Sequence, residues 1–312
     1  MAALNRRRLL ALAAAAAVHA PLPAQPRRWP ARRVHILVAY PPGGVSDMIA
    51  RDLAELLAAQ LRVAVVVENR AGASGALAIE QLARSPADGH VLCFGAATAV
   101  ALVAAARPPG GAALPVAPVA GVMRTPVLVV GTPALRAASF AGMLDLARSR
   151  PGGIRWASTG TGTTGHLVLE RVRRASGAPL VHIPYKGGGQ QINEALGGHF
   201  EVLSTNVAPQ QLQAIQGGRL APLAVGAPAR LPVLPAVPTL AELGFPQANL
   251  DSLFGLFAPS DTPAAVVARI HAEVAQALAT PGLRRKLLAA NNTPFSGSTA
   301  EFTAEVLRVA ER

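Results

Sequence analysis

Residues 39–54 read AYPPGGVSDMIARDLA, and this stretch joins a strand-like run to a helical one through two prolines and two glycines. The run before it, residues 34–39, is apolar and typical of a buried strand. After it, large apolar side chains fall on one helical face, at Ile49, Leu53, Leu56 and Leu57. Such a junction either makes a tight corner or forms a cradle in which the first helical amides face a bound anion.

Short apolar runs recur along the chain with helical segments between them. Most are continuous rather than alternating, as in strands that are covered on both faces. The predicted strands are 34–39, 63–67, 91–94, 127–130, 154–157, 181–183, 200–203, 221–225 and 254–257. This alternation predicts an α/β fold with mostly parallel sheets.

Two stretches rich in proline and glycine, 107–121 and 226–244, are predicted to connect two lobes. Two crossings make one lobe discontinuous. We expect lobe 1 to comprise 25–126 plus 227–312, and lobe 2 to comprise 127–226. In a fold of this kind the ligand lies in a cleft between the lobes, outside the carboxyl ends of strands.

A second stretch, WASTGTGTTGHLVLERV at 156–172, repeats the order of strand, glycine loop and helix. Its glycines let backbone amides approach a ligand, and its serine and threonines offer hydroxyl groups. If both loops end strands of facing lobes, a small anion would meet two helix N-termini with their partial positive charge. The alternative for either loop alone is an ordinary turn between strand and helix.

The first 24 residues are predicted to be a signal peptide, with a basic start, an apolar centre and small residues before a cut near Ala24. Arg6 and Arg7 leave both general and twin-arginine export open. The single cysteine, Cys93, lies in the apolar run VLCF and is expected to be a buried thiol. No later segment resembles a membrane helix, so we expect an exported, soluble, periplasmic protein.

The formal net charge of +12 comes mostly from scattered arginines. No basic helix, zinc-finger spacing or RNA-binding run is present in the sequence, so nucleic acid is not an expected partner. YKGGGQQ lacks the Gly-Lys-Ser/Thr ending of a phosphate-binding loop, and GASGA does not match the serine-nucleophile motif G-x-S-x-G. The histidines show no metal-ligand spacing, so neither a metal nor a cofactor is expected.

Six segments match a known family in order: YPPGGVSDMIARDLAELLAAQL, VVVENRAGASGALAIEQLARSPADGHVL, ASTGTGTTGHL, IPYKGGGQQINEALGGHFEV, LPAVPTLAELG and FGLFAPSDTPAAVVARI. The chain thereby resembles the Bug family, the extracytoplasmic solute receptors of tripartite tricarboxylate transporters. The resemblance covers nearly all of the chain after its first 24 residues. It implies a two-lobed type II periplasmic-binding-protein fold that closes over a small carboxylate and performs no catalysis.

The resemblance also implies which residues bind the ligand. The first-lobe loop would comprise Tyr40, Pro41, Gly43, Gly44, Ser46 and Asp47. The second-lobe loop would comprise Ser158, Thr159, Gly160, Gly162, Thr163, Thr164 and His166, and the cleft would also be lined by Tyr185 and Asn206. Backbone amides, hydroxyls and water would hold the carboxylate, without an arginine clamp. Relatives usually have Gly-Gly where this chain has Ser74-Gly75, and Asp where it has Thr205.

Asp47 has a second interpretation, because a carboxylate near a helix start stabilises the helix and its loop but repels a ligand anion. Two other functions remain open from the sequence. A hydrolase would use Ser46 or Ser158 with a base such as His166 within hydrogen-bond distance. A sensor that docks on a signalling protein would share the receptor fold. We expect a monomeric receptor whose partners are a small carboxylate and membrane transporter subunits.

Overall fold

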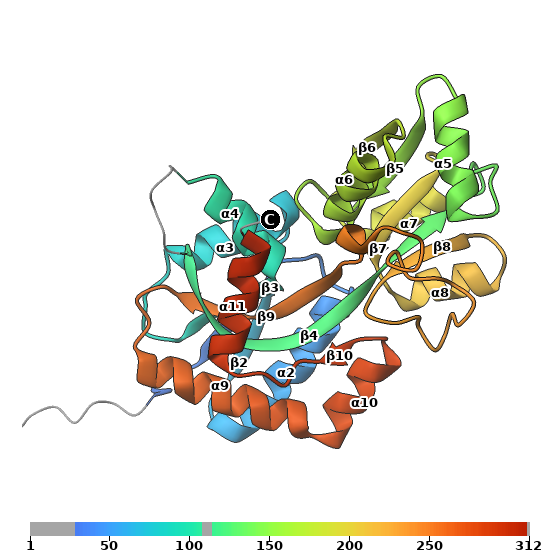
Figure 1. Cartoon of the computed structure of the whole chain (residues 1–312). Helices are drawn as coiled ribbons and strands as arrows, with labels where there is room; N and C mark the ends of the chain where they lie inside the picture. The colour runs from blue at the N-terminus through green and yellow to red at the C-terminus, as the bar shows by residue number, and fades with distance from the viewer. Residues whose placement is uncertain (1–28, 108–113, 311–312) are drawn as a thin grey trace, which may run out of the picture.

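The computed structural model describes residues 29–107 and 114–310. The predicted signal peptide and its cut lie outside these described residues. Two lobes lie side by side, and long strands run from one into the other (Figure 1). The chain therefore has the two-lobed α/β architecture that its sequence predicts.

The first lobe is built on a mixed sheet whose strand order is β2-β1-β3-β9-β4. β1 pairs in parallel with β2 and β3, whereas β9 runs antiparallel to both β3 and β4. A short strand, β10, adds to β4. The bounds are β1 Val34–Val38, β2 Val65–Asn69, β3 Val91–Ala96, β4 Val116–Gly131, β9 Asp251–Pro259 and β10 Thr293–Pro294.

The second lobe is built on β4-β7-β5-β6, with β8 also paired to β4. β5 runs parallel to β6 and β7, and the far half of β4 runs antiparallel to β7 and β8. The bounds are β5 Ile154–Ser158, β6 Leu180–Pro184, β7 Val202–Asn206 and β8 Ala221–Gly226.

Helices cover both faces of each sheet, and the buried residues accordingly form two apolar clusters in each lobe. The first-lobe helices are α2 Val45–Leu61, α3 Ala76–Ala83, α4 Ala97–Ala105, α9 Ala264–Ala279, α10 Pro281–Ala289 and α11 Thr299–Ala310. The second-lobe helices are α5 Phe140–Ser149, α6 Thr164–Ser176, α7 Gly188–Leu196 and α8 Pro209–Gln216. Two short 3₁₀ turns are η2 Ala73–Gly75 and η3 Pro246–Ala248.

β4 differs most from the sequence prediction. Residues 107–121 were predicted to be a connection between lobes, but β4 already begins at Val116 and continues to Gly131. Its prolines and glycines are accommodated because the pairing with β9 shifts register between Pro118 and Ala120 and again between Gly121 and Met123. Bulges of this kind allow a residue without an N–H group to lie in a paired strand.

The chain passes between the lobes within β4. Residues up to Pro126 pair with β9, and Val127 onward pairs with β7 and β8. Residues 227–250 return along the second lobe, because Leu240 and Ala248 lie in the same buried cluster as Trp156. We therefore propose that the second crossing lies near the start of β9 rather than at residue 227.

Local sequence patterns predict a capping box at Ser298 and Glu301, and an N-cap at Thr262 with Pro263 as the first helical residue. Ser298 and Glu301 form the predicted capping box, with Glu301 N–H donating to Ser298 Oγ and Ser298 N–H donating to Glu301 Oε2. The predicted cap of α9 is wrong by one residue, because the helix begins at Ala264 after Pro263. Thr262 instead donates its hydroxyl to the Pro259 carbonyl.

Among residues 29–107 and 114–310, no helix has the length and apolar character that crossing a membrane requires.

Candidate functional site

The first-lobe loop ends strand β1 and opens helix α2. Gly44 is the N-cap residue of α2, and no side chain caps the helix there. Pro41, Gly43 and Gly44 are exposed, and a β-carbon on Gly44 would have nothing nearer than the Pro41 carbonyl at 4.0 Å. The first amides of a helix lack partners within the helix, so this end of α2 presents unpaired N–H groups and partial positive charge.

Asp47 braces this loop from within the first turn of α2. Its carboxylate accepts hydrogen bonds from Gly43 N–H at 2.9 Å, Asn69 Nδ2 at 2.8 Å and Arg51 Nε at 3.1 Å. Asn69 Nδ2 also donates to the Tyr40 carbonyl at 3.1 Å. Burial raises the pKa of Asp47, but the bonds from Arg51, Gly43 and Asn69 outweigh it and leave the pKa below its usual value. The loop-bracing interpretation of Asp47 therefore has direct geometric support.

Tyr40 turns its ring into the first lobe. The ring makes an edge contact with Phe254, and the hydroxyl accepts a hydrogen bond from Ala96 N–H at 3.1 Å. Burial raises the pKa of Tyr40 well above its usual value. The Tyr40 side chain therefore ties the loop to the start of α4, and its carbonyl is held by Asn69.

The second-lobe loop joins β5 to α6 and is held by bonds within itself. Thr163 caps α6, since its hydroxyl accepts from His166 N–H and donates to the Gly160 carbonyl. Gly160 N–H donates to Ser158 Oγ at 3.2 Å, and Gly162 N–H donates to His166 Nδ1 at 3.0 Å. Several of the amides that the sequence predicts for a ligand are thus already used to shape the loop.

Ser158 has a histidine within hydrogen-bond distance, but it is His182 rather than His166. Ser158 Oγ lies 2.7 Å from His182 Nε2, and the His182 ring stacks on His166 at 4.1 Å. The Ser158 side chain is fully buried and also bonds to Gly160, so it is not presented to a substrate. Ser46 has no hydrogen-bonded base among the described residues. The hydrolase interpretation therefore lacks an accessible nucleophile and base.

The two stacked histidines predict how stability depends on pH. Burial lowers the pKa of His166, and burial together with His166 lowers that of His182 to about 4. The nearby Glu170 opposes both shifts and Arg173 adds to them. A histidine with a lowered folded pKa binds protons more weakly than in the unfolded chain. Above about pH 6.5 the histidine is neutral in both states, so it does not lower the free energy of unfolding. That free energy decreases as pH falls from about 6.5 toward about 4.

We expect the free energy of unfolding to fall between about pH 7.5 and pH 5, with His182 contributing about 1 kcal/mol after allowance for its partial exposure. Denaturant titrations at both pH values would measure it. His182→Gln should reduce the difference, and His199→Gln, at an exposed position, should not. Equal pH dependence in wild type and His182→Gln would contradict the assignment.

Three predicted residues remain: Thr164 and Asn206, which both bond to Ser252, and Tyr185, which does not. Ser252 lies between Thr164 and Asn206, with its Oγ 2.9 Å from Thr164 Oγ1 and 2.6 Å from Asn206 Oδ1, so this trio links β9, α6 and β7. Tyr185 instead packs on Phe200 and donates its hydroxyl to Glu194. Burial, followed by the bond to Glu194, raises the pKa of Tyr185.

The two lobes touch beside these loops, where Gly162 of the second-lobe loop lies near Leu102 and Gly187 lies near Pro41 of the first-lobe loop. A β-carbon on Gly162 would lie 3.0 Å from Leu102 of α4, and one on Gly187 would lie 3.4 Å from Pro41. Gly187 is the N-cap of α7 and, like Gly44, carries no side-chain cap. Sequence reasoning did not include this third loop, although the glycines of YKGGGQQ are a visible signal for an open helix start. Lys186 beside it is exposed.

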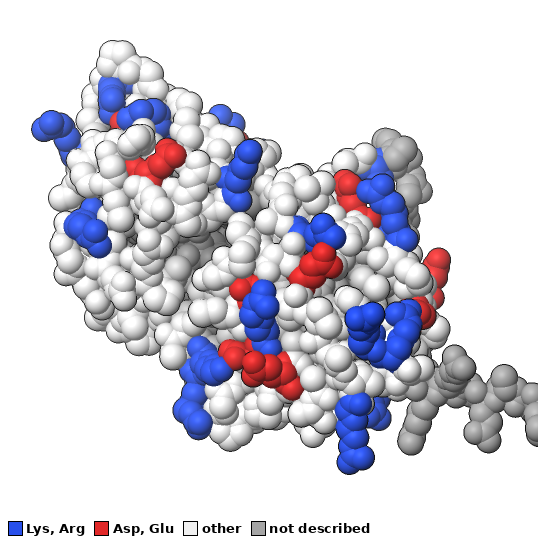
Figure 2. Space-filling view, turned by 180° about the vertical axis from the view of Figure 1, so that it is seen from behind, with Lys and Arg blue, Asp and Glu red and all other residues white. Residues whose placement is uncertain are grey.

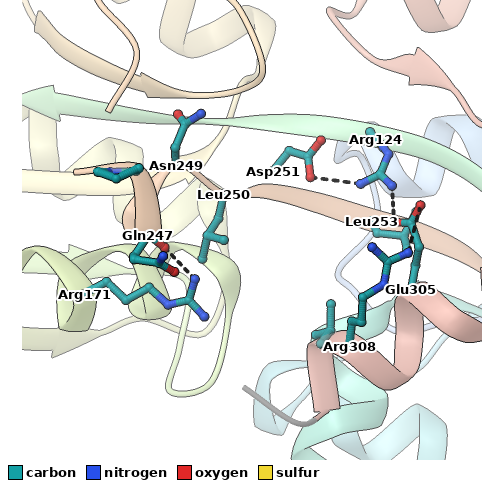
Figure 3. A pocket seen from close by; sticks show the side chains of 11 residues that line it. Arg124, Arg171, Gln247, Asn249, Leu250, Asp251, Leu253, Glu305 and Arg308 are labelled. Carbon is teal, nitrogen blue, oxygen red and sulfur yellow. Dashed lines mark hydrogen bonds and ion pairs between the residues drawn. The ribbon is translucent and has the colours of Figure 1, made fainter. Parts of the chain in front are cut away.

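A separate groove of about 380 Å³ lies near the start of β9 (Figure 3). Arg124 donates to Asp251 at 3.1 Å and is paired with Glu305 of α11, while Arg171 donates to the Gln247 carbonyl. Burial and the charge of Glu305 raise the pKa of Asp251, although Arg124 opposes the shift. Carboxylates already occupy Arg124, so the groove is a poorer anion site than the open start of α2.

Charged side chains of both signs are distributed over the surface of both lobes (Figure 2). On the face shown in Figure 2, basic side chains are scattered over both lobes among acidic ones, and a notch separates the lobes. The described residues contain no group of three or more histidine, cysteine, aspartate or glutamate side chains that could hold a metal ion. Cys93 is buried, as predicted, and burial raises its pKa.

Comparison with known proteins identifies the family. Residues 49–308 match the model of the tripartite tricarboxylate transporter family receptor. The chain belongs to this family. It is 33% identical over 301 residues to Protein BugT of Bordetella pertussis, a match that covers 93% of this chain and 90% of BugT. Members are solute-binding receptors without enzymatic activity, so the resemblance and the non-catalytic role read from the sequence are both confirmed.

Solved receptor structures show the same fold. Rpa4515 of R. palustris with adipate has a TM-score of 0.81 and 30% identity, covering 91% of this chain and 95% of that one. MatC from Rhodopseudomonas palustris with bound malate has a TM-score of 0.77 and 26% identity, covering 91% and 99%. The predicted periplasmic-binding-protein fold is thus confirmed.

Proposed function

We propose that this receptor captures a small organic carboxylate between the loops of its two lobes. The observation that carries the proposal is the start of α2, where exposed Gly44 leaves the helix without a side-chain cap, in the same loop as Pro41, which lies near Gly187 of the other lobe. A carboxylate there would accept hydrogen bonds from backbone amides and gain from the helix dipole. The uncapped start of α7 at Gly187 offers a second set of amides across the interface.

The predicted site residues then divide by role. Direct contacts are assigned to the exposed or half-buried members whose side chains make no hydrogen bond to another described residue: Pro41, Gly43, Gly44, Ser46, Thr159 and Gly162. A second group is assigned to holding the loops, because each member has side-chain atoms engaged in intramolecular bonds: Tyr40, Asp47, Ser158, Thr163, Thr164, His166, Tyr185 and Asn206. Gly160 joins this group, because it is buried and its N–H donates to Ser158 Oγ. An amide cradle can recognise the carboxylate group without an arginine or lysine clamp.

The ligand class follows from chemistry and from relatives. An amide cradle selects a carboxylate but says little about the rest of the molecule. The relatives with adipate and with malate hold dicarboxylates, and these two acids are the first candidates for this chain. We further propose export, signal-peptide removal near Ala24, a monomeric state and delivery of the ligand to transporter subunits in the membrane. A sensor role on the same fold is the alternative.

A thermal-shift screen of mono-, di- and tricarboxylates tests the ligand class. A ligand at about 100 times its Kd should raise the melting temperature by about 5 °C or more. Methyl esters of the same acids should give no shift, because they lack the charged group. Stabilisation by an ester or an amine, but by no carboxylate, would contradict the proposal.

A further inference from the structure

Ser74 has a backbone conformation that side chains disfavour. It lies in the short turn η2 between β2 and α3, with φ of 58°, and the preceding Ala73 has φ of 46°. Two successive non-glycine residues in the left-handed region are uncommon, and such strain persists only where surrounding contacts hold it.

The Ser74 hydroxyl reaches across to the second lobe. Its Oγ donates to the Thr161 carbonyl at 2.7 Å, which joins the turn after β2 to the loop after β5. The side chain also fits closely against Gly160, where a β-carbon would lie 2.4 Å from Ser74 Oγ. The glycine at position 160 thus leaves room for the serine of the opposite lobe.

The neighbouring contacts between the lobes are of a different kind. Leu102 against Gly162 and Pro41 against Gly187 are contacts of carbon atoms without a hydrogen bond. The bond from Ser252 to Thr164 lies where the chain crosses between the lobes, at the start of β9. The Ser74 bond instead joins the turn after β2 in the first lobe to the loop after β5 in the second lobe. It therefore forms only when the lobes approach each other.

We propose that Ser74 is a positioning residue that latches the second-lobe loop in the closed arrangement and thereby raises affinity for the ligand. The affinity part rests on the proposed function. A ligand held by both lobes binds only the closed form, so its apparent Kd equals the intrinsic Kd divided by the closed fraction. The latch increases that fraction, and its hydrogen bond compensates for the disfavoured backbone of Ser74.

The first test measures the distance between the lobes without ligand. Spin labels at Ala59→Cys and Arg174→Cys, exposed positions in α2 and α6, report this distance by pulsed electron spin resonance, since Cys93 is buried. Ser74→Ala and Ser74→Gly should both shift the distribution to longer distances. Ser85→Ala, which removes a hydroxyl bound to Gln81 within its own helix end, should not.

The glycine variant separates the latch from the turn, because it removes the hydroxyl and also relieves the backbone. An unchanged distribution in Ser74→Ala would overturn the proposal. A shift in Ser74→Ala that is absent in Ser74→Gly would overturn it too, by assigning the effect to the turn.

The second test titrates adipate and malate by calorimetry. Ser74→Ala and Ser74→Gly should bind about 3- to 10-fold more weakly than wild type, the loss expected for one hydrogen bond. Unchanged affinity together with a shifted distance distribution would overturn the link to affinity. If neither acid binds the wild type, the ligand class fails, while the distances still decide whether Ser74 is a latch.

Discussion

Gly44→Asp should abolish carboxylate binding without weakening the unliganded protein. The new carboxylate lies at the N-cap of α2, in open space and at an unstrained φ of −79°. There it can accept the same amide bonds as the ligand, which is worth about 1 kcal/mol to the helix. The ligand then loses its amide partners and meets a like charge, so its affinity should fall by at least about 100-fold. Calorimetry measures the affinity, and the melting temperature without ligand measures the stability.

Gly282→Asp is the matched control for this variant. Gly282 also stands in the first turn of a helix, α10, and a β-carbon there meets nothing within 4 Å. The added charge should favour that helix N-terminus in the same way and leave ligand affinity unchanged. Wild-type affinity in Gly44→Asp would show that the start of α2 does not hold the carboxylate.

Gly43 and Gly162 are poorer sites for such a test, although both belong to the predicted loops. Their φ values are 84° and 78°, so any side chain would strain the backbone. A loss of binding there would not separate a blocked ligand from a distorted turn. Gly44 separates the two because its conformation accepts any residue.

Asp47→Ala should weaken both the fold and the site. The variant removes the acceptor of Gly43 N–H, Asn69 and Arg51, and leaves the Arg51 charge without its buried partner. We expect the free energy of unfolding to fall by about 2–4 kcal/mol and affinity to fall more than about tenfold, because the loop loses its anchor. Denaturant titration and calorimetry would measure these losses.

Glu201→Ala provides the comparison in the other lobe. Glu201 is a buried carboxylate that accepts bonds from Arg155 and Arg150 at the beginning of β7, away from the loops that follow the strands. Its removal should cost a similar amount of stability and leave affinity unchanged. If both variants lose affinity alike, the effect of Asp47 reflects general destabilisation and not loop support.

Patterns within single segments predicted much of the fold. The buried strand 34–38 and the amphipathic α2 follow from local apolar spacing, and the capping box at Ser298 from a four-residue pattern. The length of β4 could not be predicted in this way. Its first half reads as a proline- and glycine-rich connection, and only pairing with β9, more than a hundred residues later, makes it a strand.

The candidate site shows the same limit. The two glycine loops and the helix starts are visible as local signals, because each follows a predicted strand and precedes a helix. The contacts that shape them join residues far apart in sequence. His182 under Ser158, Asn69 at Asp47 and Ser74 at Thr161 lack a local signature, because each depends on how separate elements pack.

A crystal structure with a carboxylate from the thermal-shift screen tests the central claim most directly. The account predicts ligand carboxylate oxygens within about 3 Å of backbone amide nitrogens in the first turn of α2, with loops of the second lobe closing over the same ligand. A carboxylate held by Arg124 or Arg308 in the groove near the start of β9, with the first turn of α2 left free, would contradict it.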